Sequence, residues 1–280
     1  MRIRKKYLFY LLAFSSAIIA AVNSGVDATV SALYITDVWA LGLAIFLIGI
    51  PVTIVFGLFF SIPFRKKSVG SRIVDPSFKR LRLLRKQEVK PQILAAFGNA
   101  IYTVGYFALF SILGDPSIVL PFSQAVILYL VAIESINEKD VPTLSEIQSI
   151  LIVTFGAILG SISLSGSLSL ESLVIVFFVI NPGWVLLTVY QRKLKWLRID
   201  GEFNDSINIR FWNIIFACLI TAVLIFVYDY VMGTNHLNAG VIALVDQFYW
   251  ALLIAIGAFF ALVFYIRALG IGKASVVQAV

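Results

Sequence analysis

Long apolar runs are the feature that most constrains the fold of this chain. They recur throughout its 280 residues. Several reach the roughly 18 apolar residues that cross a hydrocarbon core of about 30 Å as a helix. Inside a membrane every backbone N–H and C=O needs an internal partner, which leaves only helices or closed barrels. Barrel strands alternate in hydrophobicity over about 10 residues, whereas these runs are longer and continuously apolar. The sequence therefore predicts an all-α polytopic membrane protein.

Composition narrows the possible functions. Hydrophobic residues make up 60% of the chain and charged residues 13%, against about 25% charged in soluble domains. The net charge of +7 fits basic cytoplasmic loops, so we expect no nucleic-acid partner. A single cysteine, Cys218, and a single histidine, His236, argue against an internal disulfide, a Cys/His metal site and a Cys–His catalytic pair. The phosphate-loop pattern GxxxxGK[ST] is absent. We expect no cofactor and no enzymatic activity.

The distribution of basic residues predicts the topology. Eight spans and the start of a ninth near Ala274 are expected at 7–30, 38–63, 91–113, 117–136, 146–164, 171–191, 209–232 and 247–269. With the N-terminus in the cytoplasm and a crossing at every span, all 22 Lys and Arg residues fall on the cytoplasmic side. This is the positive-inside pattern of a multi-pass protein of the cell membrane. Met1–Ala21 also has the features of a cleaved secretory signal, and its removal would leave the later topology unchanged.

The loop 64–90 has a pattern of its own. Asp75-Pro76 is typical of an N-cap followed by a proline at the first helical position. Phe78, Leu81 and Leu84 then recur at helical spacing among basic residues. The pattern predicts a basic amphipathic helix over 76–90 that lies on the cytoplasmic membrane surface and binds anionic lipid. The alternative is a solvated loop that serves only as a topology signal.

An internal repeat indicates two related halves. Leu113–Val119 (LGDPSIV) and Ile271–Val277 (IGKASVV) resemble each other at an offset of 158 residues, and each follows an aromatic-rich helix that contains Ala-Leu. The first copy joins predicted spans 3 and 4, and the second joins spans 8 and 9, so the repeat unit is five helices. Because five is odd, the halves would be inverted in the membrane. Inverted repeats with a site between them are typical of secondary transporters.

The region from Ala108-Leu109 through Gly114–Pro121, the apolar helix that ends at Glu134, and Val141-Pro142-Thr143 with Gly156–Leu159 resembles the drug/metabolite transporter superfamily. The similarity is closest to its EamA-type proteins, densest over 91–165, and recurs at 247–280. It implies a ten-helix fold of two inverted five-helix halves, a central cavity lined mainly by helices 1, 3, 4, 6, 8 and 9, and export or exchange of metabolites.

The resemblance also implies the domain organisation. Residues 1–165 would form the first EamA-like repeat, including the basic amphipathic loop 64–90, and 166–280 an incomplete second repeat. The loop after span 2 is long for the family. The chain stops seven residues into the expected helix 9, where its terminal carboxylate would lie at a costly depth. We therefore expect a chain truncated within helix 9.

Polar and aromatic residues within the spans are the candidates for solute binding. No predicted span has an ionisable residue near its middle, apart from Asp27 towards the outer end of span 1, with Asn23 one turn earlier. The alternative for Asp27 is an interfacial acid that only supports topology. Stripes at helical spacing occur in span 3 and span 6, and weaker candidates elsewhere: Asn99, Tyr102, Thr103 and Tyr106; Asn181, Trp184 and Thr188 beside Pro182 and Gly183; then Gln124, Tyr265 and Gln278. Such stripes could form an apolar pocket with a few hydrogen bonds, or serve as polar contacts between helices.

Two further groups have a structural interpretation. Glu134 matches the family's acid at the end of helix 4, where it more plausibly stabilises the cytoplasmic turn, with Lys139 as a partner, than binds solute. Asp200, Glu202 and Asp205 form the only acidic cluster. Their irregular spacing among Gly and Asn indicates a solvated loop.

The leading hypothesis is a secondary carrier of a small metabolite or drug-like solute, working by alternating access between the halves and providing efflux or exchange. A membrane-embedded enzyme and a non-transporting scaffold or channel subunit are the alternatives. The sequence shows no paired acids, His–acid cluster or metal motif to favour the enzyme.

Overall fold

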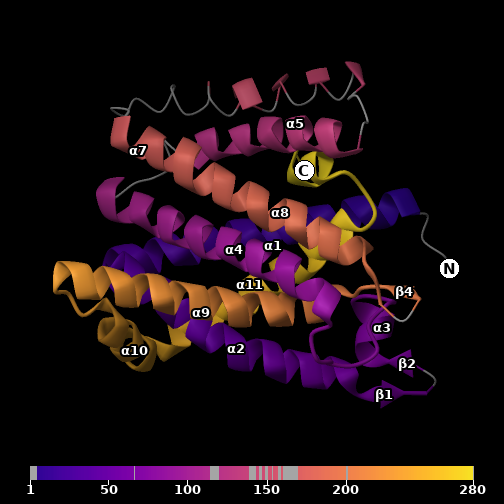
Figure 1. The fold of residues 1–280 in the computed structure, drawn as a ribbon, viewed down its shortest axis with the longest axis horizontal. Coiled ribbons are helices and arrows are strands. Elements are labelled where there is room, and N and C mark those ends of the chain that lie inside the picture. Colours follow the sequence, from indigo (N-terminus) through magenta and orange to yellow (C-terminus); the bar gives the residue numbers. More distant parts are fainter. Residues whose placement is uncertain are drawn as a thin grey trace.

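The computed structural model is a bundle of long helices (Figure 1). It describes residues 5–65, 67–113, 120–138, 170–199 and 201–279, with isolated residues and short stretches between 143 and 159. Most of the predicted span 146–164, the predicted boundary at 165 and residues 114–119 of the first repeat copy lie outside the described residues. The inversion of two five-helix halves therefore remains a prediction.

Six helical segments of the described chain are long and apolar enough to cross a membrane. They are α1 (Lys5–Leu33), α2 (Val38–Ser61), α4 (Lys86–Leu113), the continuous segment Leu170–Trp196, α9 (Ser206–Met232) and α11 (Phe248–Leu269). Each overlaps a span expected from the sequence. The prediction of an all-α polytopic membrane protein is thereby confirmed.

Shorter elements complete the described bundle. The predicted fourth span begins as a 3-10 turn, η2 (Leu120–Ala125), and continues as α5 (Val126–Glu138). The predicted ninth span begins as α12 (Ala274–Ala279). A helix that the sequence analysis did not expect, α10 (His236–Asp246), joins α9 to α11. A short hairpin of β3 (Arg198–Ile199) and β4 (Glu202–Phe203) precedes α9.

Local chemistry explains where these helices begin, bend and end. Asp37 caps α2, because its carboxylate accepts hydrogen bonds from the backbone N–H groups of Trp39 and Ala40 at 2.9 and 3.1 Å. The segment Leu170–Trp196 consists of α7 (Leu170–Ile175), a π-helical turn η3 (Val176–Ile180) and α8 (Asn181–Trp196). The wider turn lies just before Pro182, whose missing N–H interrupts the regular ladder. Gly233, at φ 69°, ends α9 in the left-handed conformation.

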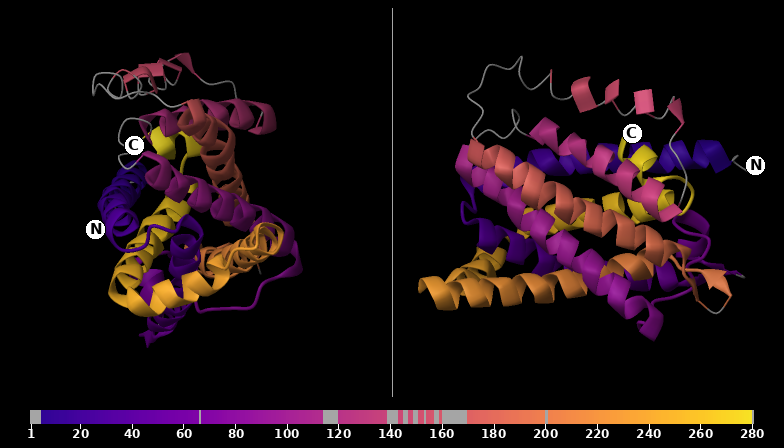
Figure 2. Two further views of the ribbon diagram at one scale, coloured as in Figure 1. Left: turned by 90° about the vertical axis from the view of Figure 1, so that its left-hand side faces the viewer. Right: turned by 45° about the horizontal axis from the view of Figure 1, so that its top comes forward.

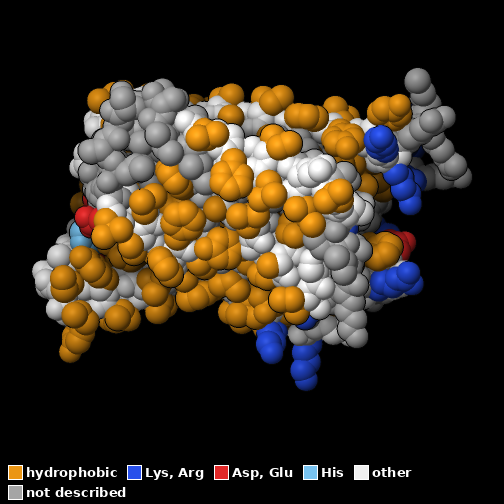
Figure 3. All heavy atoms as spheres, turned by 90° about the horizontal axis from the view of Figure 1, so that it is seen from above, with side chains coloured by type: hydrophobic (Ala, Val, Ile, Leu, Met, Phe, Trp, Pro, Cys, Tyr) orange, Lys and Arg blue, Asp and Glu red, His pale blue; other side chains and the backbone are white. Residues whose placement is uncertain are grey.

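The surface is that of a protein embedded in lipid. Large apolar side chains such as Phe14, Val22, Val223 and Phe226 are more than half exposed, and apolar side chains cover the middle of the face seen in Figure 3. Lys and Arg side chains gather at one end of that face. We call this end, where α1, α4 and α9 begin and α8 ends, the basic end. The arrangement supports a multi-pass membrane protein.

Helix packing places α4 at the centre of the bundle. It packs along α8 and α9, while α1 packs along α11 (Figure 2). The contact between α4 and α8 is close because glycines face each other across it. A Cβ atom on Gly98 would lie 2.5 Å from the carbonyl oxygen of Gly183, and one on Gly183 would lie 2.8 Å from the backbone nitrogen of Tyr102. Small residues at this crossing allow the backbones to approach.

The prediction of an amphipathic helix over 76–90 is wrong for residues 76–85, which are not helical. The segment forms the hairpin of β1 (Pro63–Phe64) and β2 (Lys67–Ser68), then α3 (Val69–Ile73), and is irregular from 74 until α4 begins at Lys86. Phe78 is fully buried in a cluster with Phe60 and Phe259, and Leu81 packs against the same cluster. The apolar side chains therefore face the protein core. Binding of anionic lipid by this segment remains a prediction.

Asp75 explains why the expected helix does not begin there. Its carboxylate is buried and accepts hydrogen bonds from Lys195 Nζ at 2.6 Å and from the backbone N–H and hydroxyl of Ser206 at 2.8 and 2.7 Å. Burial alone would raise the pKa of Asp75, but Lys195 and the Ser206 donors outweigh it and hold the pKa below its ordinary value. The side chain that would cap a helix instead ties the loop to α8 and α9.

A second set of contacts completes this end. Arg82 forms a two-pronged ion pair with Glu88 at 2.6 and 2.7 Å and also donates to the side chain of Asn204 at 2.8 Å. Asp205 is buried and caps α9 by accepting from the backbone N–H of Asn208 at 2.7 Å. Burial raises the pKa of Asp205 to about 6, against the opposing effect of the Asn208 hydrogen bonds. The expectation that Asp205 belongs to a solvated loop is therefore wrong.

Candidate functional site

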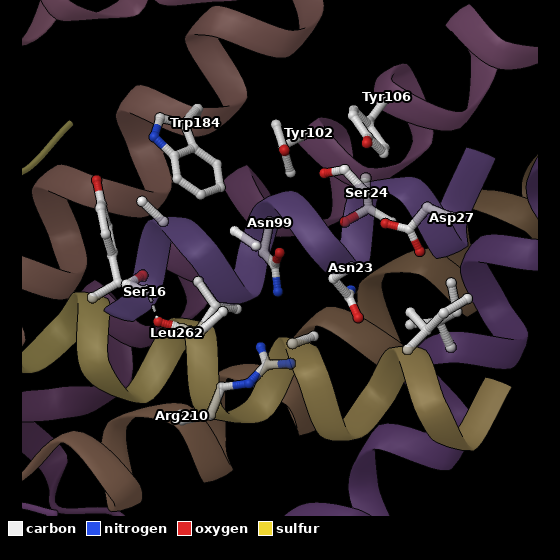
Figure 4. A pocket seen from close by; sticks show the side chains of 18 of the residues that line it. Ser16, Asn23, Ser24, Asp27, Asn99, Tyr102, Tyr106, Trp184, Arg210 and Leu262 are labelled. Carbon is white, nitrogen blue, oxygen red and sulfur yellow. Dashed lines mark hydrogen bonds between the residues drawn. The ribbon is translucent and has the colours of Figure 1, made fainter. Parts of the chain in front are cut away.

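A cavity of about 230 Å³ lies within the bundle (Figure 4). Its walls come from α1, α2, α4, α8, α9, α11 and α12. Pockets for drug-sized ligands span roughly 300–1,000 Å³, so this cavity suits a smaller solute. Its lining is mostly apolar, with polar groups from α1, α4 and α9 pointing into it.

Nine of the twelve residues predicted from sequence as candidates for solute binding line this cavity. They are Asn23, Asp27, Asn99, Tyr102, Thr103, Tyr106, Trp184, Tyr265 and Gln278. The structure thus brings together the two-residue group of α1, the whole stripe of α4 and single residues of α8, α11 and α12. Their role in binding a solute remains a prediction.

Three predicted residues are not among the described lining residues. Thr188 is fully buried behind the wall, where its hydroxyl lies 2.9 Å from the Tyr265 hydroxyl. Asn181 is fully buried where α8 begins. Gln124 is half-buried in η2. Thr188 positions a wall residue, while Asn181 and Gln124 lie outside the cavity.

Aromatic rings form one wall. The ring centroids of Tyr102 and Trp184 are 4.6 Å apart, and those of Trp184 and Tyr265 are 5.5 Å apart. The indole N–H of Trp184 donates to Gln278 Oε1 at 2.7 Å, and the Tyr265 hydroxyl donates to the same oxygen at 3.3 Å. These bonds fix the rings of α8 and α11 against α12. The result is a rigid aromatic surface of the kind that packs against the apolar body of a small solute.

The polar face of α1 forms the opposite wall. Ser16 donates to the carbonyl oxygen of Ala261 at 2.8 Å and fixes α1 against α11. Asn23 packs onto Gly257, where a Cβ atom would lie 2.3 Å from Asn23 Oδ1. Asp27 is 8% exposed, and its Oδ1 atom has no hydrogen-bond partner among the described residues. A carboxylate buried in this way is a functional candidate by default in a membrane protein.

Arg210 is a residue of the site that was not predicted from the sequence. As one of the basic residues it indicated only the cytoplasmic side, but its side chain is 3% exposed and lines the cavity from the first turns of α9. Figure 4 shows its guanidinium group directed toward Asn99. Asn213 Oδ1 accepts from Asn99 Nδ2 at 2.9 Å and lies 3.4 Å from Arg210 Nη1. The spacing of Arg210 and Asn213, three residues apart at the start of an apolar span, was the available signal.

Asp27 and Arg210 do not pair with each other. Within the described part of the chain, no carboxylate oxygen lies within 4.0 Å of an Arg210 nitrogen, and no basic nitrogen within that distance of Asp27. Burying a charge that has no ion-pair partner is costly. Two opposite charges that face the same cavity without neutralising each other therefore lower the stability of the empty bundle.

Glu134 has structural contacts other than the expected one with the cytoplasmic turn. It forms a buried ion pair with Arg192 and accepts from the backbone N–H groups of Ala274 and Ser275 at 2.6 and 3.2 Å. It also accepts from the Ser275 hydroxyl at 2.5 Å. Lys139, the expected partner, lies outside the described residues. Glu134 therefore connects the end of α5 to α8 and to the start of α12.

No protein-family model matches this chain, and no curated protein matches it significantly. The resemblance to the EamA-type proteins described above therefore remains a prediction.

Proposed function

We propose that this protein is a secondary transporter that moves a small solute across the cell membrane by alternating access. The observation that carries the proposal is the cavity among membrane-spanning helices, with buried polar and charged side chains directed into it. Polar groups at this depth are costly unless they serve a solute or an ion. The proposal includes membership of the EamA-type family and export or exchange as the physiological direction.

The origin of the lining residues supports this function. The cavity takes side chains from α1, α4, α8, α11 and α12, which correspond to predicted spans 1, 3, 6, 8 and 9. Five of the six helices expected to line the family's cavity are therefore represented, and α2 and α9 also contribute. In inverted-repeat carriers the solute site lies between the halves near the membrane midplane. We assign the basic end to the cytoplasm because membrane proteins retain Lys and Arg on that side.

Flux measurements with purified protein in liposomes test the proposal. Vesicles loaded with an unlabelled metabolite mixture should take up a labelled member of the mixture by exchange, and protein-free vesicles should not. Asn99→Ala and Trp184→Ala should each lower the rate, because they remove a polar and an aromatic contact of the cavity. Lys79→Ala, at an exposed position of the basic end, is the matched control and should leave the rate unchanged.

Two results would contradict the proposal. The first is folded, monodisperse protein that exchanges no member of a broad metabolite panel. The second is ion-channel behaviour in planar bilayers, because a channel passes solute far faster than a carrier that must change conformation for each molecule.

A further inference from the structure

The unpaired charges of the cavity identify the class of solute. Asp27 on α1 and Arg210 on α9 are both more than nine-tenths buried, and both line the cavity. Asp27 Oδ1 and Arg210 Nε have no hydrogen-bond partner among the described residues. A site with one charge would favour a solute of the opposite sign. A site with one charge of each sign favours a solute that carries both.

The two charges lie in different parts of the cavity. In Figure 4, Asp27 is close to Ser24 and Tyr106, while the guanidinium of Arg210 lies beside Asn99, with Asn23 between the two regions. Asn99 and Tyr106 are seven residues apart on α4, which corresponds to a rise of about 10 Å. Charge-assisted hydrogen bonds of about 2.8 Å at each end would take up part of such a span. The charges of a solute that bridges it would be several ångströms apart.

The remaining walls suit the body of such a solute. Tyr102, Trp184 and Tyr265 add aromatic faces to the wall of the same cavity. The cavity volume of about 230 Å³ favours a short chain.

We propose that the cavity binds a small zwitterion, with its ammonium group at Asp27, its carboxylate at Arg210 and a short apolar segment between them. This inference rests on the proposed transport function, and it specifies the solute for the same site. It also explains why two opposite charges remain separate within the bundle. Each is neutralised by the solute, and a direct ion pair between them would abolish the site.

Binding to the purified wild-type protein, measured by thermal shift and calorimetry, tests the inference. The probes are glycine, β-alanine, 4-aminobutyrate, 5-aminopentanoate and 6-aminohexanoate, which differ only in the distance between their charges. Affinity should pass through a maximum at an intermediate length. For the best length, the amine without the carboxylate and the acid without the ammonium should bind at least about tenfold more weakly, as expected for loss of a charged hydrogen bond.

Two variants assign the ends of the solute. Asp27→Asn should weaken binding of the zwitterion and leave binding of the acid-only probe unchanged. Arg210→Gln should weaken the zwitterion and the acid-only probe and leave the amine-only probe unchanged. A purely structural role would weaken all probes alike, so this pattern separates recognition from folding. Lys79→Gln serves as the control and should bind every probe as the wild type does.

The outcomes separate this inference from transport itself. Equal binding of zwitterion, amine and acid, or no binding of any length, would overturn the zwitterion assignment. An optimum at glycine would overturn the spacing. Liposome exchange of an uncharged solute, without zwitterion binding, would leave the transporter proposal standing and refute the solute class. Zwitterion binding without any exchange would support the solute class and refute the transporter proposal.

Discussion

Asp75 is the residue on which the basic end of the bundle most depends. It carries the only carboxylate within 4.0 Å of Lys195 in the described part of the chain, and both side chains are buried. Removing one partner of a buried pair leaves the other charge uncompensated, which costs about 3–5 kcal/mol. Asp75→Asn should therefore lower the free energy of unfolding by about this amount.

Reversible unfolding in mixed micelles measures the effect. Lys79→Ala is the matched control, because the Lys79–Glu202 pair is exposed and such pairs contribute about 0–1 kcal/mol. Equal stabilities of the Asp75 and Lys79 variants would contradict the assigned role of Asp75.

The same residue gives a pH-dependent prediction. Lys195 and Ser206 hold the pKa of Asp75 below its ordinary value of 3.8, despite burial. The folded carboxyl group therefore binds fewer protons than the unfolded one, so its contribution is complete above pH 3.8 and is lost as the pH falls below that value. The difference in melting temperature between wild type and Asp75→Asn should shrink as the pH is lowered from 5 to 3. A gap that widens under acid would refute the assignment.

At the residue scale, the sequence was a good guide only where helix geometry alone decides. The stripe from Asn99 to Tyr106 lines one cavity because residues at i, i+3, i+4 and i+7 share a helix face. Arg210 could not be assigned in that way. The distribution of basic residues indicates only on which side of the membrane a segment lies. The burial of Arg210 depends instead on the packing of α9 against α4. Asn181 belongs to a stripe of the same kind, but its position is set by the π-helical turn before it.

At the scale of elements, the crossing of α4 and α8 depends on Gly98. A Cβ atom at this position would lie 2.5–2.6 Å from backbone atoms of α8. Because these are backbone atoms, no change of side-chain rotamer can relieve the clash. Gly98→Ala should separate the two helices and cost about 1–3 kcal/mol, as overpacking does. It should also weaken solute binding, because Tyr102 and Trp184 are carried by the same two helices.

Gly25→Ala is the control for this prediction. No atom lies within 4 Å of a Cβ atom placed on Gly25 of α1, and alanine is favoured over glycine within helices by about 1 kcal/mol. This variant should be as stable as wild type or slightly more so. Thermal unfolding followed by size-exclusion chromatography compares the two variants. A Gly98 variant that melts with the wild type would exclude a close backbone contact at this crossing.

Six of the spans were predictable from sequence because hydrocarbon imposes one rule on length and polarity. The cytoplasmic segment was not, because no such rule applies outside the membrane. Asp75-Pro76 favours a helix start by local propensity, yet Lys195 and Ser206, more than 100 residues away, provide stronger partners for the carboxylate. The short helix α10 was missed because its 11 residues cannot span a membrane. Tertiary contacts decide both segments.

At the scale of the whole molecule, the two ends of the bundle differ in chemistry. The basic end is held by the buried ion pair of Asp75 with Lys195 and by the partly buried pair of Arg82 with Glu88. The opposite end carries α10, where His236 lies 2.6 Å from Asp37 and Asp229 accepts from the backbone N–H of His236 at 3.0 Å. The proposed alternating access requires each end to open in turn, so under this proposal these contacts would be broken and remade during each cycle. Their orientation in the cell determines which set faces the cytoplasm.

Cysteine labelling in intact cells tests this orientation. Cys218 is buried and is the only cysteine of the chain, so a Cys218→Ser background should be unreactive. In that background, Asn235→Cys at the α10 end should react with a membrane-impermeant maleimide, and Lys79→Cys at the basic end should react only after the cells are permeabilised. Both positions are exposed, so lack of reaction reports the membrane barrier. The expectation follows from the cytoplasmic retention of Lys and Arg. Labelling of Lys79→Cys alone in intact cells would invert the assigned topology, and labelling of both would show that the number of crossings between 79 and 235 is even rather than odd.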